Sequence, residues 1–281
     1  MSKSISRDFT TGNVTKELVR FAVPLFLANI LQIVYNMVDM TVAGHVMGAV
    51  GLSSIAIGGD VTDFLTALVM GFGNAGQVIV SQNLGARRPD RIGRFIGTFI
   101  STLFVSAVTV TTVGLILRRY ILIWLNAPAE SFEEALRYST VVMAGLVFIY
   151  GYNAVSAILR GLCDSRHLFI FIAISAIMNV ILDLLFMAVF RWGAFGAALA
   201  TVISQAVSFI SCLIFLVKKK NELGFEFQLK YIRFDREMLG DLLKLGVPMS
   251  LKSAAVRISM LFTNSFINSY GVIVSAVTGV A

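Results

Sequence analysis

Six ionisable side chains lie inside long apolar stretches of this 281-residue chain: Asp39, Asp60, Asp63, Asp183, Lys252 and Arg257. An ionisable group is costly where lipid or apolar side chains surround it, so each needs a partner, a water-filled cavity or a chemical role. Carboxylates in such surroundings bind protons or hard cations, because either one removes the buried charge. These residues are therefore the first candidates for ion binding.

Asn179 and Asp183 are the pair whose spacing is most informative. They are four residues apart, so on a helix their side chains share one face, a single turn apart. Asp39 follows Tyr35 by one turn, and Thr201 lies in an apolar run, so each can add oxygen ligands. We interpret these side chains as a site for a sodium ion or a proton. The alternative is that they only form hydrogen bonds between helices.

Asp60 and Asp63 form a second acidic pair, three residues apart and facing the same way on a helix. Together with Tyr35 they are candidates for the wall of a cavity. Lys252 and Arg257 are further cavity candidates, because they too lie inside an apolar stretch. The alternative is that the two aspartates form hydrogen bonds or pair with these two cations across a helix bundle.

Other motifs in the chain do not indicate catalysis or a cofactor. Cys163 and Cys212 lack metal-ligand spacing and are interpreted as packing residues. Gly71–Gly76 fits GxGxxG, but it follows no strand and lies in an apolar helix, so close helix packing is the better interpretation. His45 and His167 fall on opposite sides of the predicted bilayer and cannot share a metal. We therefore expect no enzyme, no cofactor, and no metal ion other than sodium.

The elements that must position these residues are membrane-spanning helices. The chain is 57% hydrophobic and 14% charged, against about 45–50% and about 25% in soluble domains. Uncharged runs recur at the length of about 20 residues that a bilayer requires. The sequence predicts an all-α, polytopic bundle with helices near 18–46, 52–83, 93–117, 136–160, 167–190, 194–217 and 241–268. An eighth helix begins near Gly271, and the chain is expected to be truncated within it at Ala281.

The net charge of +7 predicts topology rather than nucleic-acid binding, because the basic residues lie in short segments between apolar runs. Most of the 23 basic residues fall in the amino-terminal segment and in alternate connections, which predicts that these lie in the cytoplasm. The opposite side has only Arg118, Arg119, Arg137 and Arg191. We expect a multi-pass protein of the cytoplasmic (inner) membrane with a cytoplasmic amino terminus, in contact with membrane lipid.

A weak internal repeat suggests two lobes. LVRFAVPL at 18–25 matches LLKLGVPM at 242–249, with Pro24 and Pro248 in register. The predicted domains are a six-helix lobe at 1–217, a cytoplasmic linker at 218–240 and the beginning of a second lobe at 241–281. The rest of that carboxyl-terminal lobe is expected in the full-length protein.

Several strings, in this order along nearly the whole chain, resemble the multidrug and toxic compound extrusion family of transporters. They are VPLFLANILQIVYNMVDMTVAGHVMG, GFGNAGQVIVSQNLGA, NAVSAILRGLCDS, NVILD and GAALAT. The resemblance implies a twelve-helix antiporter with two lobes around a cavity, which exports organic cations in exchange for sodium ions or protons. It also implies a cation site at Asp39, Asn153, Asn179, Asp183 and Thr201.

Two other functions stay open. A flippase for lipid-linked oligosaccharides or lipids in the same superfamily would share the helices and the repeat, but its cavity is expected to carry many basic residues. Only Lys252 and Arg257 are found here. A membrane-embedded enzyme would need acid, base or metal ligands at one depth, and the positions of the histidines and cysteines disfavour it. We expect a small, cationic substrate for a transporter.

Overall fold

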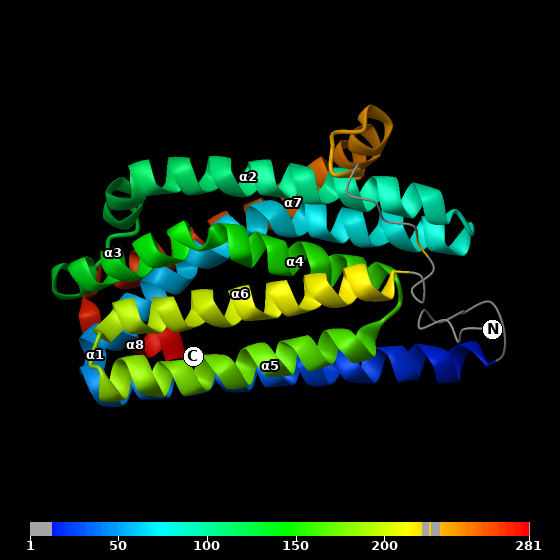
Figure 1. Ribbon diagram of the computed structural model, residues 1–281. Helices are drawn as coiled ribbons and strands as arrows, with labels where there is room; N and C mark the ends of the chain where they lie inside the picture. Colours follow the sequence, from blue (N-terminus) through cyan, green and yellow to red (C-terminus); the bar gives the residue numbers. More distant parts are fainter. Residues whose placement is uncertain (1–12, 221–224, 226–230, 281) are drawn as a thin grey trace.

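The computed structural model describes residues 13–220, 225 and 231–280. In these ranges the chain forms helices and no strand, which confirms the all-α prediction (Figure 1). The segments are α1 (Val14–Gly85), α2 (Pro89–Trp124), α3 (Ala129–Ala144), α4 (Leu146–Gly161), α5 (Ser165–Asp183), the π-helix η1 (Leu184–Val189), α6 (Gly193–Lys219), α7 (Arg236–Asn268) and α8 (Val272–Val280). We call the end of the bundle where α2, α5 and α7 begin and α6 ends the basic end.

Helix α1 is two spans joined by a bend. A straight helix of its 72 residues would be about 108 Å long, more than three times the apolar thickness of a bilayer. The bend is at Gly48, whose φ of 64° and ψ of −152° break the helical path. Glycine tolerates a positive φ because it has no Cβ. Residues 14–47 form the first arm of α1 and residues 49–85 the second, and the two arms correspond to the helices predicted at 18–46 and 52–83.

The predicted membrane spans are confirmed as helices. Five helices are long and apolar enough to cross a membrane, or six if the pair α3 and α4 is one span. The predicted helix ends are less accurate than the predicted spans, because a helix can continue beyond the apolar run that crosses the bilayer. Helix α2 continues past residue 117 to Trp124, and α7 begins at Arg236 rather than at 241, where the side chain of Asp235 accepts hydrogen bonds from Glu237 N and Met238 N.

The helix predicted at 136–160 is broken in the structure. Helices α3 and α4 meet at Gly145 with a bend of 55°. A Cβ at Gly145 would collide with the side chain of Val202 on α6, so the glycine allows α6 to approach the bend closely. Hydropathy alone did not reveal the break, because apolar residues continue through it.

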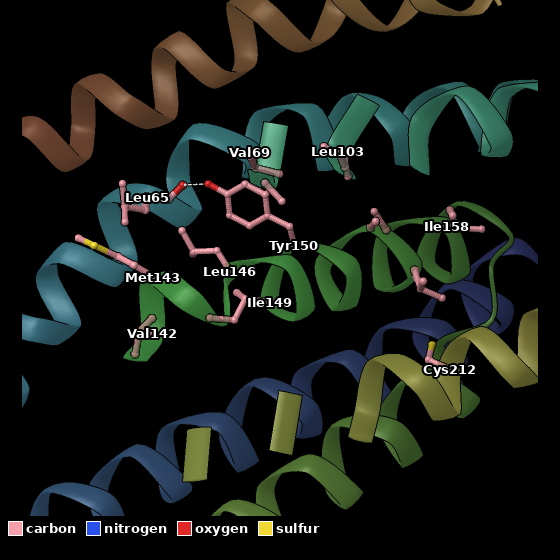
Figure 2. Packing of buried hydrophobic residues seen from close by; sticks show 14 of the residues in the cluster. Leu65, Val69, Leu103, Val142, Met143, Leu146, Ile149, Tyr150, Ile158 and Cys212 are labelled. Carbon is pink, nitrogen blue, oxygen red and sulfur yellow. Dashed lines mark hydrogen bonds between the residues drawn. The ribbon is translucent and has the colours of Figure 1, made fainter. Parts of the chain in front are cut away.

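A buried core lies between the second arm of α1, α2 and α4. Figure 2 shows Leu65 and Val69 packing beside Leu146, Ile149 and Tyr150. The hydroxyl of Tyr150 donates a 2.6 Å hydrogen bond to the carbonyl of Leu65, which satisfies the polar end of a buried ring. This core holds α4 against α1.

Helix α7 packs along the second arm of α1 and is held to α2 at the basic end. A Cβ at Gly71 would overlap the backbone of Ser250, so the glycine permits a close crossing, as expected from the small residues in that segment. At the start of the two helices, Arg94 lies 2.6 Å from Asp235 and Arg91 lies 2.6 Å from Glu237. The predicted linker at 218–240 falls partly outside the described residues, and the predicted domain boundaries stay a prediction.

Candidate cation site

Asp39, Asn179 and Asp183 lie buried between the first arm of α1 and α5, two helices that pack against each other. Their exposed fractions are 9%, 3% and 0%. The shared face expected for Asn179 and Asp183 is turned into the bundle, since both are buried. Asp39 and Asp183 are close enough to interact electrostatically, so the structure brings together two carboxyl groups that are far apart in the sequence.

Five of the six side-chain polar atoms of this cluster are buried and lack hydrogen-bond partners among the described residues. They are Oδ1 of Asp39, both side-chain amide atoms of Asn179 and both carboxylate oxygens of Asp183. Folded proteins satisfy about 90% or more of their buried polar groups, so five such atoms in one cluster need an explanation. Carboxylate and amide oxygens are ligands for a hard cation, and a carboxylate also accepts a proton. The donor set therefore fits a sodium ion or a proton.

Two tyrosines lie beside the cluster. Tyr35 is half-buried on α1, and Tyr138 on α3 is 6% exposed. Both tyrosines interact electrostatically with Asp39 and Asp183. No described lysine or arginine forms an ion pair with either aspartate. Tyr138 was missed by sequence reasoning, because it lies next to Arg137 at the start of the helix predicted at 136–160.

Asn153 and Thr201 are less closely tied to the cluster. The amide nitrogen of Asn153 donates a 2.8 Å hydrogen bond to Ile149 O within α4. Thr201 is half-buried on α6, and its carbonyl accepts a 2.9 Å hydrogen bond from Ser204. Neither side chain bonds the carboxylates among the described residues. Their roles as cation ligands stay predictions.

The π-helix η1 begins directly after Asp183, and the sequence did not predict it. A π-helical turn holds one extra residue and often occurs at functional sites. Phe186 of η1 lies against Gly196 on α6 and stacks on Trp192 with ring centroids 5.1 Å apart. The backbone that follows Asp183 is thereby packed against the start of α6.

The second acidic pair has partners. Asn264 donates a 2.7 Å hydrogen bond to Asp60, and Arg257 forms a 2.9 Å ion pair with Asp63, both from α7. Pairing across the bundle, the alternative considered for these residues, is present for Asp63, and their place in a cavity wall stays a prediction. Lys252 is exposed on α7. The ion pair with Asp63 compensates the charge of Arg257.

A family model described as MatE matches residues 24–185, more than half of the chain. The probable multidrug resistance protein YpnP of Bacillus subtilis strain 168 is 32% identical over 264 residues, which cover 94% of this chain and 58% of YpnP. The chain thus spans less than two thirds of the length of this relative.

Solved structures share the fold. An outward-facing multidrug resistance MATE family transporter of the MOP superfamily matches with a TM-score of 0.83 and 24% identity, over 96% of this chain and 63% of that chain. The MATE multidrug transporter DinF-BH, in complex with a small molecule, matches with a TM-score of 0.90 and 21% identity, over 99% of this chain and 62% of that chain.

Proposed function

Because the chain belongs to the MatE family of multidrug and toxic compound extrusion transporters, we propose that it is part of a cation-coupled antiporter. It exports small organic cations in exchange for sodium ions or protons. The names of its relatives refer to multidrug resistance, and one related structure holds a small molecule. The observation that carries the proposal is the buried cluster of Asp39, Asn179 and Asp183, in which five side-chain polar atoms are buried without a partner among the described residues.

Cation binding changes the energy of the cluster more than that of the rest of the bundle. Two neighbouring carboxylates repel each other and are costly to bury as ions. A sodium ion or a proton between Asp39 and Asp183 neutralises one of the two negative charges and so relieves their repulsion. The two residues lie on different helices, so the cation also draws α1 and α5 together.

Coupling follows if the outward-facing and inward-facing states hold this cation with different affinities. If the cation binds one state more tightly and the substrate binds the other, then by linkage each ligand lowers the affinity of the protein for the other by the same factor. The first arm of α1 is suited to change shape, because Pro24 removes one helical hydrogen bond and Gly48 bends its far end. Asn153 and Thr201 complete the shell in this proposal, and Tyr35 lies at its edge.

The same proposal places residues 1–217 in a first lobe, 218–240 in a cytoplasmic linker and 241–281 in the beginning of a second lobe. The protein lies in the inner membrane with its amino terminus in the cytoplasm. The support is the excess of basic residues at the basic end, such as Arg87, Arg88, Lys218 and Lys219. Labelling of cysteines introduced at Arg88 and at Arg118 from outside the cell tests it, and only the second is expected to react.

Transport by the complete protein tests the cation site. Asp39→Asn and Asp183→Asn each keep the size of the side chain and remove its charge, and each is expected to reduce sodium- or proton-driven efflux of a fluorescent cationic dye by about 100-fold or more. Glu133→Gln is the matched control, because Glu133 is exposed and lies outside the cluster. Normal efflux in both aspartate variants would rule out the site.

A further inference from the structure

Helices α5 and α6 run antiparallel, side by side, with a register that two contacts define (Figure 1). The hydroxyl of Ser208 on α6 donates a 2.7 Å hydrogen bond to Phe171 O on α5. Nearer the basic end, the rings of His167 and Phe215 have centroids 4.4 Å apart. Continued toward Asp183, this register places Ser175 level with Gln205.

Polar side chains follow this interface from the cation site toward the basic end. We call this set the polar seam: Ser175, Asn179, Thr201, Ser204, Gln205 and Ser208. Four of its members, Ser175, Asn179, Ser204 and Ser208, are 8% exposed or less. Helical spacing of three or four residues keeps the members of each helix on one side of it. The seam therefore forms a polar strip along the interface between α5 and α6.

Two positions of the polar seam have unused hydrogen-bonding capacity. Oε1 of Gln205 on α6 is buried and has no partner among the described residues, and neither side-chain amide atom of Asn179 on α5 has one. Ser208, in contrast, satisfies its hydroxyl on the α5 backbone. Most buried polar groups in proteins are satisfied in this way or by similar bonds. Unused acceptors on two facing helices indicate a ligand that passes between them.

The polar seam ends at a set of aromatic rings. Phe171 and Phe215 have centroids 5.6 Å apart, and Phe215 also stacks on His167. Beyond them, at the basic end, the ring of His167 bonds Asp164 at 2.7 Å, and Asp164 is only 4% exposed. Asn179 is twelve residues from His167 along α5, roughly 18 Å at about 1.5 Å per residue.

We propose that the polar seam is the route by which the coupling cation moves between the Asp39–Asn179–Asp183 cluster and the basic end. Gln205 is the relay in the middle of this route, and the Phe171–Phe215 pair closes it in the conformation described. Hydroxyl and amide oxygens can pass either a proton or a sodium ion, so the route serves either ion. The inference rests on the proposed function, because it needs a cation that binds the cluster.

Trp192 provides a spectroscopic reporter for the test. Its ring stacks on Phe186, which belongs to the π-helix that begins after Asp183, so cation binding at Asp183 is expected to change its fluorescence. The chain has two tryptophans, and Trp124→Phe removes the other signal. Stopped-flow addition of sodium, or a downward pH jump, to the purified protein then gives a rate and an amplitude.

Gln205→Leu is expected to slow this response by about tenfold or more, because the relay acceptor is lost, while the final amplitude and the half-saturating concentration stay the same. Gln205→Glu keeps an oxygen at this position and should restore the rate. Phe215→Ala opens the closure and should raise the rate. Thr112→Val is the matched control, since this exposed hydroxyl bonds only its own helix, at Val108 O.

An unchanged rate in Gln205→Leu would overturn the route. Asp183→Asn separates this failure from failure of the proposed function. If Asp183→Asn loses the response while Gln205→Leu keeps the normal rate, the cation site stands and the route is wrong. A full response in Asp183→Asn, or a wild-type protein that responds to neither ion, would overturn both.

Discussion

Asp183 and Asp235 are both aspartates at helix ends, but their surroundings are opposite. Asp235, before α7, accepts hydrogen bonds from Arg94 at 2.6 and 3.0 Å and from the backbone N–H groups of Glu237 and Met238. Asp183, at the end of α5, is 0% exposed and accepts none among the described residues. The first carboxylate stabilises a helix junction. The second is a cost in the folded state that a bound cation would remove.

The largest effect is expected from removing the charge of the unsatisfied cluster. In sodium-free buffer at a pH high enough to ionise both carboxyl groups, the double variant Asp39→Asn with Asp183→Asn should have a free energy of unfolding about 2–4 kcal/mol higher than that of the wild type, because two buried ions that repel each other are gone. Thermal or denaturant unfolding in detergent measures this. A less stable double variant would mean that the charges of the cluster are compensated in the folded protein and that the contrast with Asp235 does not hold.

At the basic end, removing a charge is expected to lower the free energy of unfolding rather than raise it. Arg94→Ala leaves Asp235 without its charged partner and should lower the free energy of unfolding by about 1–2 kcal/mol. The loss should be smaller in Asp235→Asn with Arg94→Ala than the sum of the two single variants, since the residues contact each other. If the two losses are additive in this double-mutant cycle, the interaction between Arg94 and Asp235 does not contribute to the free energy of unfolding.

The pH dependence of the basic end follows from Asp235. Its hydrogen bond with Arg94, together with the backbone N–H groups of α7, lowers the pKa of this carboxyl below its ordinary value. The folded protein therefore binds the proton less tightly than the unfolded chain, and the stabilisation is complete above about pH 4 and lost as the pH falls further. Unfolding measured from about pH 6 to pH 3 should show this loss in the wild type and not in Asp235→Asn.

The smallest effect is expected for a pair that is charged and exposed. Arg119 and Glu133 are 3.5 Å apart, with side chains 66% and 69% exposed. Arg119→Ala should change the free energy of unfolding by less than about 0.5 kcal/mol, because solvent screens such pairs. An effect as large as that of Arg94→Ala would show that burial does not explain the difference between the two ends.

Part of the candidate site could be predicted from residue types and spacing. Asn179 and Asp183 were predicted to share a face, and both are buried in the bundle. The broken helix at Gly145 and the π-helix after Asp183 could not be predicted, because they depend on how α6 packs against these segments. Asp63 shows the same limit, since its pairing with Arg257 depends on the position of α7.

The sequence by itself determined that the chain is a bundle of membrane helices and where along the chain each span lies. The physical reason is local: a run of about 20 apolar residues must form a helix in lipid, whatever its neighbours are. Only the tertiary structure decided which polar groups have partners. Asp63 meets Arg257, whereas Asp39 meets Asp183 and no cation of the described chain, because hydrogen bonds and charge pairs depend on which helices lie side by side.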